Sequence, residues 1–238
     1  MLDPATQSRS LETHATHGRR TGNHGPAAEN LPDLLLIERS RAGDEAAIEA
    51  LIRRYSRRLY RVARSVVADD DRAEAVVQEA YLAAFGDLTR YEPTGKFAAW
   101  LTRLAYQQAR MQRAGMRFTG VGNGTSVGAA DAEDSPERRE LEHTIGCLPE
   151  VFRTVFVLRV VEGISGIETA ASLGVHETTV RTRLYRAHRR LDAEAVRRMR
   201  STASLLELPP ARLERVLTRV LAHLPQGTTT STPAAASP

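Results

Sequence analysis

A basic stretch near the carboxyl end could bind the phosphates and base edges of DNA. Residues 177–200 contain eight arginines and three acidic residues, although the net charge of the whole 238-residue chain is only +4. Guanidinium groups donate bidentately to phosphates and base edges, and hydroxyl groups add further hydrogen bonds. The side chains suited to this are Thr178, Thr179, Arg181, Thr182, Arg183, Tyr185, Arg186 and Arg189. A basic helix face that contacts only solvent has a similar composition. The elements around this stretch are therefore needed to distinguish DNA binding from a solvated face.

Two short helices joined by a tight turn are predicted around this stretch. Ser165 can cap a first helix over residues 165–173, and Gly174 can end it because glycine enters the left-handed conformation at little cost. A second helix is predicted from about Glu177. Its apolar residues recur at helical spacing and form one stripe for burial: Val180, Leu184, Ala187 and Leu191. This pattern is typical of a helix-turn-helix whose second helix enters a major groove.

A helix predicted over residues 96–114 carries a second set of side chains suited to nucleic acid. One side is apolar and includes Phe97 and Leu101. Another side combines cations with an aromatic ring: Lys96, Trp100, Arg103, Gln107 and Arg110. Cations for phosphates and flat faces for bases are what a single strand requires. The alternative is a core tryptophan with a solvated basic rim.

A helix predicted from about residue 69 to residue 88 carries an acidic edge. Asp69, Asp70 and Asp71 begin it, where acidic groups suit the positive end of the helix dipole. The hydrogen-bonding edge consists of Asp71, Glu74, Gln78 and Glu79. It suits a basic partner helix, or only water.

Hydrophobic spacing predicts further helices and no strand, so the expected fold class is all-α. The expected helices cover residues 34–41, 44–67, 137–146, 149–163 and 211–224. In the second of these the apolar stripe should be buried and the arginines, including Arg61, should face solvent. The last is amphipathic and is expected to pack on its own chain. Val151 is expected in the core, and Cys147 as a small buried hydrophobe.

Several classes of function are disfavoured. A single cysteine allows neither an internal disulfide nor a Cys-rich zinc site, and His14, His17 and His24 lie in a polar tail without a fixed backbone. No cofactor or metal is therefore predicted. No nucleophile-base set or glycine-rich phosphate loop is evident, so the chain is not expected to be an enzyme. The most apolar run, residues 151–161, contains two arginines and is too short to cross a bilayer. No secretion signal is seen, so no membrane insertion and a cytoplasmic location are expected.

Taken in order, these motifs resemble the extracytoplasmic-function (ECF) group of bacterial sigma factors in the sigma-70 family. The resemblance covers about residues 32–193. Its motifs are GDEAAIEALIRRYSRRLYRVARSVV, DRAEAVVQEAYLAAF, GKFAAWLTRLAYQQA and LPEVFRTVFVLRVVEGISGIETAASLGVHETTVRTRLYRAHRRL. Each motif is weak alone, and the ordered set is specific.

The resemblance implies two small helical domains joined by a flexible linker. The tails and the last helix lie outside the resemblance, and the composition of the tails predicts that they are disordered. The expected parts are a tail (1–31), region 2 (32–114), a linker (115–136), region 4 (137–200), an amphipathic helix (201–224) and a second tail (225–238). Region 2 would bind the -10 element through the loop at 89–95 and the Lys96 to Arg110 face. Region 4 would bind the -35 element through its arginine-bearing helix.

The implied partners are core RNA polymerase, promoter DNA and an anti-sigma factor. The acidic edge would dock on the clamp helices of the largest polymerase subunit, and the flap of the second-largest subunit would be a further contact. The protein would be a non-enzymatic subunit that directs polymerase to promoters and helps to open the duplex.

Three positions depart from the family pattern. Ala75 replaces a usual aspartate, Phe85 a common tryptophan, and His176 a helix-capping serine. The first two affect the expected polymerase contact, and the third removes a good helix cap. An alternative function is a free-standing helix-turn-helix regulator that binds operator DNA without polymerase. That alternative leaves the Lys96 to Arg110 face and the acidic edge unexplained.

Overall fold

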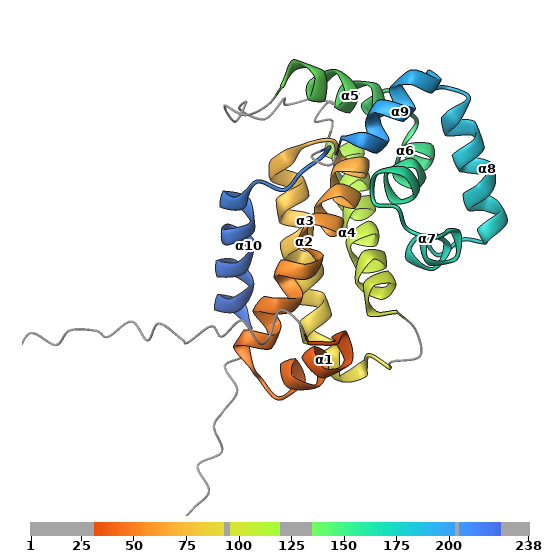
Figure 1. Cartoon of the computed structure of the whole chain (residues 1–238). Coiled ribbons are helices and arrows are strands. Elements are labelled where there is room, and N and C mark those ends of the chain that lie inside the picture. The colour runs from red at the N-terminus through yellow and green to blue at the C-terminus, as the bar shows by residue number, and fades with distance from the viewer. Residues whose placement is uncertain (1–30, 93–95, 120–134, 203–204, 225–238) are drawn as a thin grey trace, which may run out of the picture.

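The computed structural model describes residues 31–92, 96–119, 135–202 and 205–224. Within these ranges the regular elements are all helical, which confirms the predicted fold class. Figure 1 shows a central bundle of α2, α3 and α4, with α10 on one side and α6, α7 and α8 on the other. The predicted disordered tails and most of the predicted linker lie outside the described residues.

Four helices and a short 3₁₀ turn form an amino-terminal module. They are α1 (Asp33–Arg41), α2 (Glu45–Val67), α3 (Asp70–Gly86), the 3₁₀ turn (Leu88–Arg90) and α4 (Phe97–Thr119). Aspartates begin two of the helices: Asp44 Oδ1 accepts the Ala46 N–H at 3.0 Å, and Asp69 Oδ1 accepts the Arg72 N–H at 2.9 Å. Each such cap contributes about 1 kcal/mol.

The predicted apolar stripe of α2 forms the centre of this module. All of its members are buried: Ile48, Leu51, Ile52, Tyr55, Leu59, Val62, Ala63 and Val66. Both α3 and α4 pack against α2 and against each other. The spacing in the sequence therefore identified the core face of the longest buried helix correctly.

Helices α5 to α9 form a carboxy-terminal module. They are α5 (Pro136–Gly146), α6 (Glu150–Phe156), a π-helical turn (Val157–Val161), α7 (Gly166–Leu173), α8 (Glu177–His188) and α9 (Ala193–Ser201). Much of this module packs around its own apolar cluster: Leu141, Ile145, Leu148, Phe156, Val157, Ala187, Val196, Met199, Leu205 and Leu206.

The two modules pack directly against each other. Helix α7 lies along α4, and α6 lies against α2. Apolar residues of the carboxy-terminal module join the core of the amino-terminal module: Val155, Leu158, Ile164, Ala170, Leu173 and Val180. A buried hydrogen bond from Ser65 Oγ to Thr154 Oγ1, 3.0 Å long, also crosses this boundary.

Arg61 is the most deeply buried charge at the boundary. Its Nη1 lies 2.6 Å from Glu162 Oε1, its Nε donates to the Leu205 carbonyl at 2.8 Å, and its side chain is 3% exposed. The prediction that this arginine faces solvent was wrong, because the carboxy-terminal module covers that face of α2. Sequence spacing marked the face as polar and could not show what covered it.

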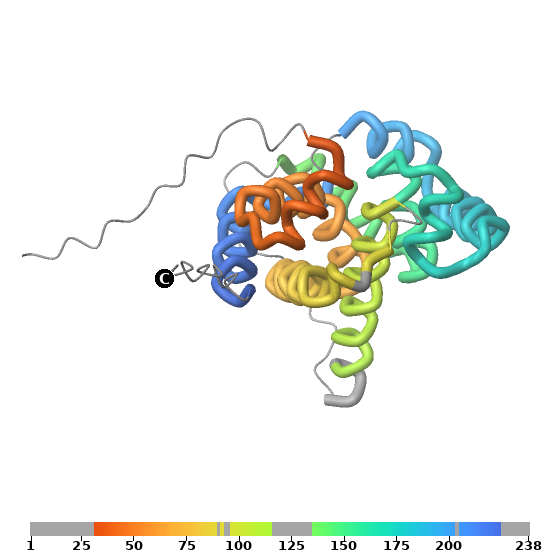
Figure 2. The backbone as a smooth tube through the Cα atoms, turned by 90° about the horizontal axis from the view of Figure 1, so that it is seen from below, coloured from red at the N-terminus to blue at the C-terminus, as the bar shows by residue number. Residues whose placement is uncertain are grey.

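Helix α10 (Pro210–His223) packs on α2 and α3. Figure 1 and Figure 2 both show it on the side of the central bundle away from α7 and α8. Its Val216, Leu217 and Val220 are buried against the amino-terminal core. This confirms the expectation that the final amphipathic helix packs on its own chain.

Three further expectations need correction. Cys147 is exposed, because Ile145 and Leu148 take the inward positions at the turn after α5. Val151 is 38% exposed, because the first turn of α6 lies at the surface. Helix α4 continues to Thr119, beyond the predicted end at residue 114. Helix α9, capped by Asp192, was not predicted as a separate element.

Candidate nucleic-acid interface

The turn between α7 and α8 has the geometry of a helix-turn-helix. Ser165 Oγ accepts the Glu168 N–H at 3.1 Å and begins α7. Gly174 has φ +65°, and the following Val175 N–H donates to the Ala170 carbonyl at 3.1 Å, which closes the turn. His176 precedes α8 in an extended conformation and makes no side-chain capping bond. The predicted serine cap, glycine turn and missing cap before α8 are all confirmed.

Helix α8 presents most of the predicted DNA-contacting side chains to solvent. Thr178, Arg181, Thr182, Tyr185, Arg186 and Arg189 are exposed, whereas Thr179 and Arg183 are half-buried. Tyr185 is 62% exposed, so its ring is open to solvent beside the arginines. Val180 and Ala187, on the opposite side, are buried. The amphipathic pattern was therefore assigned to the correct faces.

The inner side of α8 contacts the amino-terminal module, because Val180 belongs to the apolar core of that module. Burial raises the pKa of Tyr106, and the charges of Arg110 and Arg183 act against that rise. Burial and the charge of Arg200 lower the pKa of His188 at the end of α8, which favours its neutral form.

The basic face of α4 exists as predicted, but α7 lies against it. Lys96, Arg103, Gln107 and Arg110 are exposed and Trp100 is half-buried. Lys96 Nζ lies 3.0 Å from Glu168 Oε2 of α7. A Cβ placed on Gly174 would lie 3.2 Å from Arg103 Nη2, so this guanidinium rests on the turn of the helix-turn-helix.

Trp100 belongs to an aromatic group at the start of α4. Its ring centroid lies 4.8 Å from that of Tyr91 and 5.5 Å from that of Phe97. Phe97 also meets Tyr55 of α2 edge-on at 5.7 Å. The sequence allowed either a tryptophan that stacks on bases or a tryptophan in the core. Trp100 is only partly buried against the core, so part of its side chain is exposed.

Glu168 holds the two modules together at this face. Its Oε2 pairs with Lys96, and its Oε1 lies 2.8 Å from Arg58 Nη1 of α2. Burial acts to raise the pKa of Glu168, but hydrogen bonds from Lys96 and Arg58 outweigh burial and lower it. Glu168 was not among the predicted site residues, because its partners are distant in the chain.

The residues of the predicted acidic edge of α3 do not all face the same neighbour: some contact α10 and one contacts α4. Glu74 is 7% exposed, and Gln78 Nε2 donates to its Oε1 at 3.3 Å. Asp71 lies at the surface beside it. Glu79 faces the other way and accepts a hydrogen bond from Gln112 Nε2 of α4 at 3.4 Å.

Two arginines of α10 bind this edge. Arg215 donates to both carboxylate oxygens of Glu74, from Nε at 2.8 Å and from Nη2 at 2.6 Å. Arg212 Nη1 lies 2.9 Å from Glu74 Oε2 and 2.8 Å from Asp71 Oδ1. A basic partner helix was one of the two predicted neighbours of this edge, but the sequence pattern did not identify α10 as that helix. The signal was two arginines three positions apart beside the apolar stripe of the last helix.

The described residues contain no group of His, Cys, Asp or Glu side chains placed to hold a metal ion. None of the described helices is both long and apolar enough to span a membrane.

A helix-turn-helix whose second helix exposes arginines, together with a basic aromatic helix face in a second all-helical module, is the arrangement of a two-module DNA-binding protein. Two family models match these modules in the same order. Region 2 of sigma-70 matches residues 51–116, and region 4 of sigma-70 matches residues 138–191. The chain belongs to the sigma-70 family, in its extracytoplasmic-function group, as the order of motifs predicted.

Known relatives agree with this assignment. The chain is 30% identical over 182 residues to the ECF RNA polymerase sigma-E factor of Escherichia coli K12, covering 69% of this chain and 95% of that protein. It is 31% identical over 181 residues to the RNA polymerase sigma-H factor of Pseudomonas aeruginosa, covering 67% and 92%. The solved structure of CnrH in complex with the cytosolic domain of CnrY is also similar, with 27% identity, a TM-score of 0.50 and coverage of 66% and 93%.

Proposed function

We propose that this chain is a sigma factor that binds core RNA polymerase, directs it to promoters through -10 and -35 elements and assists the opening of DNA. The observation that carries the proposal is the presence, in one chain, of an open recognition helix α8 and a separate basic aromatic face on α4. A free-standing operator-binding regulator would account for α8 alone. Relatives named as polymerase sigma factors, similar over most of their length, favour the same function.

The proposed roles follow the two modules. Residues 137–200 would bind the -35 element, with Arg181 and Arg186 of α8 donating to phosphates and base edges in the major groove. Residues 32–114 would bind the -10 element through the α4 face. Unstacking a base costs a few kcal/mol, and stacking on Trp100 would return about 1 to 3 kcal/mol. Two weak contacts on one DNA reinforce each other through effective concentration.

The acidic edge of α3 is the proposed polymerase contact. Its carboxylates would meet a basic segment of the polymerase clamp helices, and the flap of the second-largest subunit would contact the carboxy-terminal module. The protein would act without catalysis or cofactor, and in the cytoplasm, where polymerase acts. An anti-sigma factor is a further proposed partner, as membership of the extracytoplasmic-function group suggests; the similar CnrH was solved with a protein partner, the cytosolic domain of CnrY.

Promoter binding requires a change in the arrangement described above. DNA cannot reach the whole α4 face while Glu168 pairs with Lys96 and the turn at Gly174 lies against Arg103. The modules must therefore separate before both promoter elements are bound. Residues 117–137 lie between the two family matches.

Transcription reconstituted with purified core RNA polymerase on genomic DNA fragments tests the proposal. Specific transcripts that start only when the chain is added are expected. Binding of the chain to particular DNA sites without any association with polymerase would instead support the operator-binding regulator.

A further inference from the structure

Helix α10 is an addition to the matched family regions, and it occupies a surface that the proposed function requires. The region 4 match ends at residue 191, whereas α10 begins at Pro210. The helix packs on α2 and α3 of the amino-terminal module, which are distant from it in the sequence. There it meets the acidic edge proposed for polymerase binding.

The contact is specific in its charges. Both oxygens of Glu74 are bound by the guanidinium fork of Arg215, and Arg212 bridges Glu74 and Asp71 at 2.9 and 2.8 Å. Only 10% of the Glu74 side chain is exposed. A forked, bidentate guanidinium-carboxylate pair is among the strongest hydrogen-bonded arrangements available to side chains. Together Arg215 and Arg212 make three hydrogen bonds to the two carboxylate oxygens of Glu74, so a basic group of a partner must compete with both arginines to bind there.

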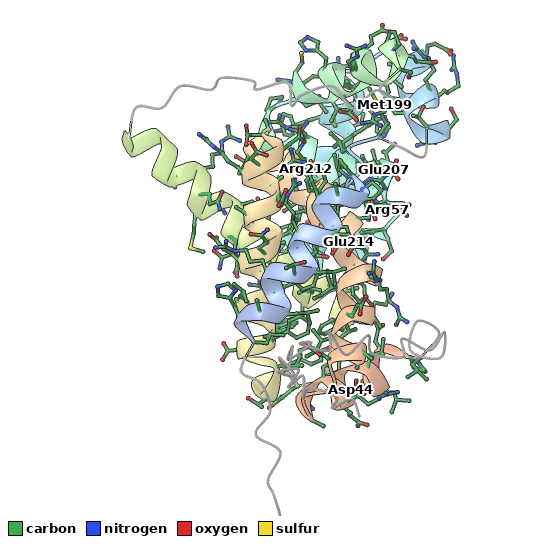
Figure 3. All side chains as sticks on the ribbon, turned by 90° about the vertical axis from the view of Figure 1, so that its left-hand side faces the viewer. Asp44, Arg57, Met199, Glu207, Arg212 and Glu214 are labelled. Carbon is green, nitrogen blue, oxygen red and sulfur yellow. The ribbon has the colours of Figure 1, made fainter. Side chains whose placement is uncertain are left out.

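Helix α10 also makes contacts with the amino-terminal module that do not involve the acidic edge. Glu214 Oε1 lies 3.1 Å from Arg53 Nη1 of α2, on the other side of the helix. Figure 3 shows α10 lying across α2 and α3, with Arg212 and Glu214 projecting from it. Between these polar contacts the stripe of Val216, Leu217 and Val220 is buried. Helix α10 thus has a buried apolar stripe with charged residues on either side of it. These residues pair with opposite charges on α2 and α3.

We infer that α10 is a built-in competitor of core RNA polymerase: its Arg212 and Arg215 occupy Asp71 and Glu74, so polymerase must displace the helix to bind the acidic edge. The inference rests on the proposed function. Residues 202–209 are the whole connection between α9 and α10, so the local concentration of the helix at its site is high. The apparent affinity for polymerase is then reduced by the fraction of molecules whose edge is uncovered.

The test uses the full chain and purified core RNA polymerase. The double variant Arg212→Ala/Arg215→Ala removes both guanidinium groups from the acidic edge. We expect it to bind polymerase about tenfold more tightly than the wild type, which corresponds to about 1.4 kcal/mol. The matched control is Arg219→Ala, which removes an exposed arginine of the same helix that does not contact the edge, and its affinity should equal that of the wild type.

A second variant separates release of α10 from changes at the edge itself. Glu214→Ala removes the ion pair with Arg53 and leaves Glu74 and Asp71 with their arginines. The Glu214 side chain is 61% exposed in the wild type. About a twofold gain in polymerase affinity is expected, in keeping with a surface ion pair. Unchanged amide exchange in α2, α3 and α4 would show that each variant is folded.

Amide exchange in the complex gives an independent readout. The α10 amides of the wild-type chain should exchange faster when polymerase is bound than in the free chain. Equal or weaker polymerase binding by the double variant, or α10 amides that stay protected in the complex, would overturn the inference and leave the proposed function standing. If neither the wild type nor any variant binds polymerase or directs transcription, the proposed function itself fails and the inference with it.

Discussion

Replacing Glu162 by glutamine should destabilise the protein strongly, although Glu162 lies outside every proposed binding surface. Glu162 Oε1 lies 2.6 Å from Arg61 Nη1, and the two side chains are 7% and 3% exposed. The variant Glu162→Gln keeps the size of the side chain and a hydrogen-bond acceptor but removes the negative charge that faces the buried guanidinium.

The magnitude follows from the burial of the pair. Opposite unit charges about 4 Å apart attract by about 4 kcal/mol at an effective dielectric constant of about 20. The amide oxygen returns about 1 kcal/mol as a neutral hydrogen bond. The expected loss in the free energy of unfolding is therefore about 3 kcal/mol, at the lower end of the roughly 3 to 5 kcal/mol lost when a buried ion pair is broken.

Urea unfolding followed by circular dichroism measures this loss as a lower midpoint at unchanged slope. The matched control is Glu194→Gln, since Glu194 pairs with Arg197 in α9 where the two side chains are 58% and 69% exposed. Less than about 1 kcal/mol should be lost there. If both variants lose equally little, Arg61 reaches water in solution and the modules do not share a buried ion pair, which would refute the reasoning.

Four further expectations concern binding and folding. Arg181→Ala and Arg186→Ala in α8 should each cost about 1 to 3 kcal/mol of promoter binding in a footprinting titration while polymerase affinity is retained; loss of both would mean a damaged fold. Trp100→Ala should slow promoter opening, followed with a permanganate or fluorescent-base probe, more than it weakens duplex binding; normal opening kinetics would assign Trp100 to the core alone. Gly174→Ala should lower stability by about 1 to 2 kcal/mol in thermal unfolding because its φ is +65°, whereas an unchanged melting temperature would contradict the left-handed turn. The pKa of Glu168 is lowered in the folded protein, so its contribution to stability is present at neutral pH and is lost as acid protonates the carboxylate; Glu168→Gln should flatten the acid limb of the stability curve, and an unaltered limb would count against the paired carboxylate.

Features that depend on neighbours in sequence were predictable. Ser165 and Gly174 bound α7 as expected, and Asp44 begins α2 as expected, because caps and left-handed turns are local matters of hydrogen bonding and sterics. The open face of α8 was likewise correct, since helical spacing alone separates Val180 from Arg181. These local signals were enough to identify the fold class and the helix-turn-helix.

Features that depend on distant contacts were not predictable from the pattern. Arg61 has the spacing of a surface residue, and only the arrival of Glu162 and Leu205 from the carboxy-terminal half makes it buried. The same holds for Glu74, which sequence analysis placed on a polar edge and which α10 encloses. The helical period in a sequence distinguishes the apolar face of a helix from its polar face. It does not show which distant segment of the chain will cover the polar face.

The double attachment of Arg61 has a consequence for motion. One guanidinium binds Glu162, ahead of the helix-turn-helix, and the Leu205 carbonyl in the segment that leads to α10. Moving either segment alone would strand a charge or a carbonyl away from water, so intermediate positions are costly. Arg61 therefore couples the two segments. The carboxy-terminal module and the segment that leads to α10 should dissociate from α2 together, in one abrupt two-state transition instead of a gradual displacement.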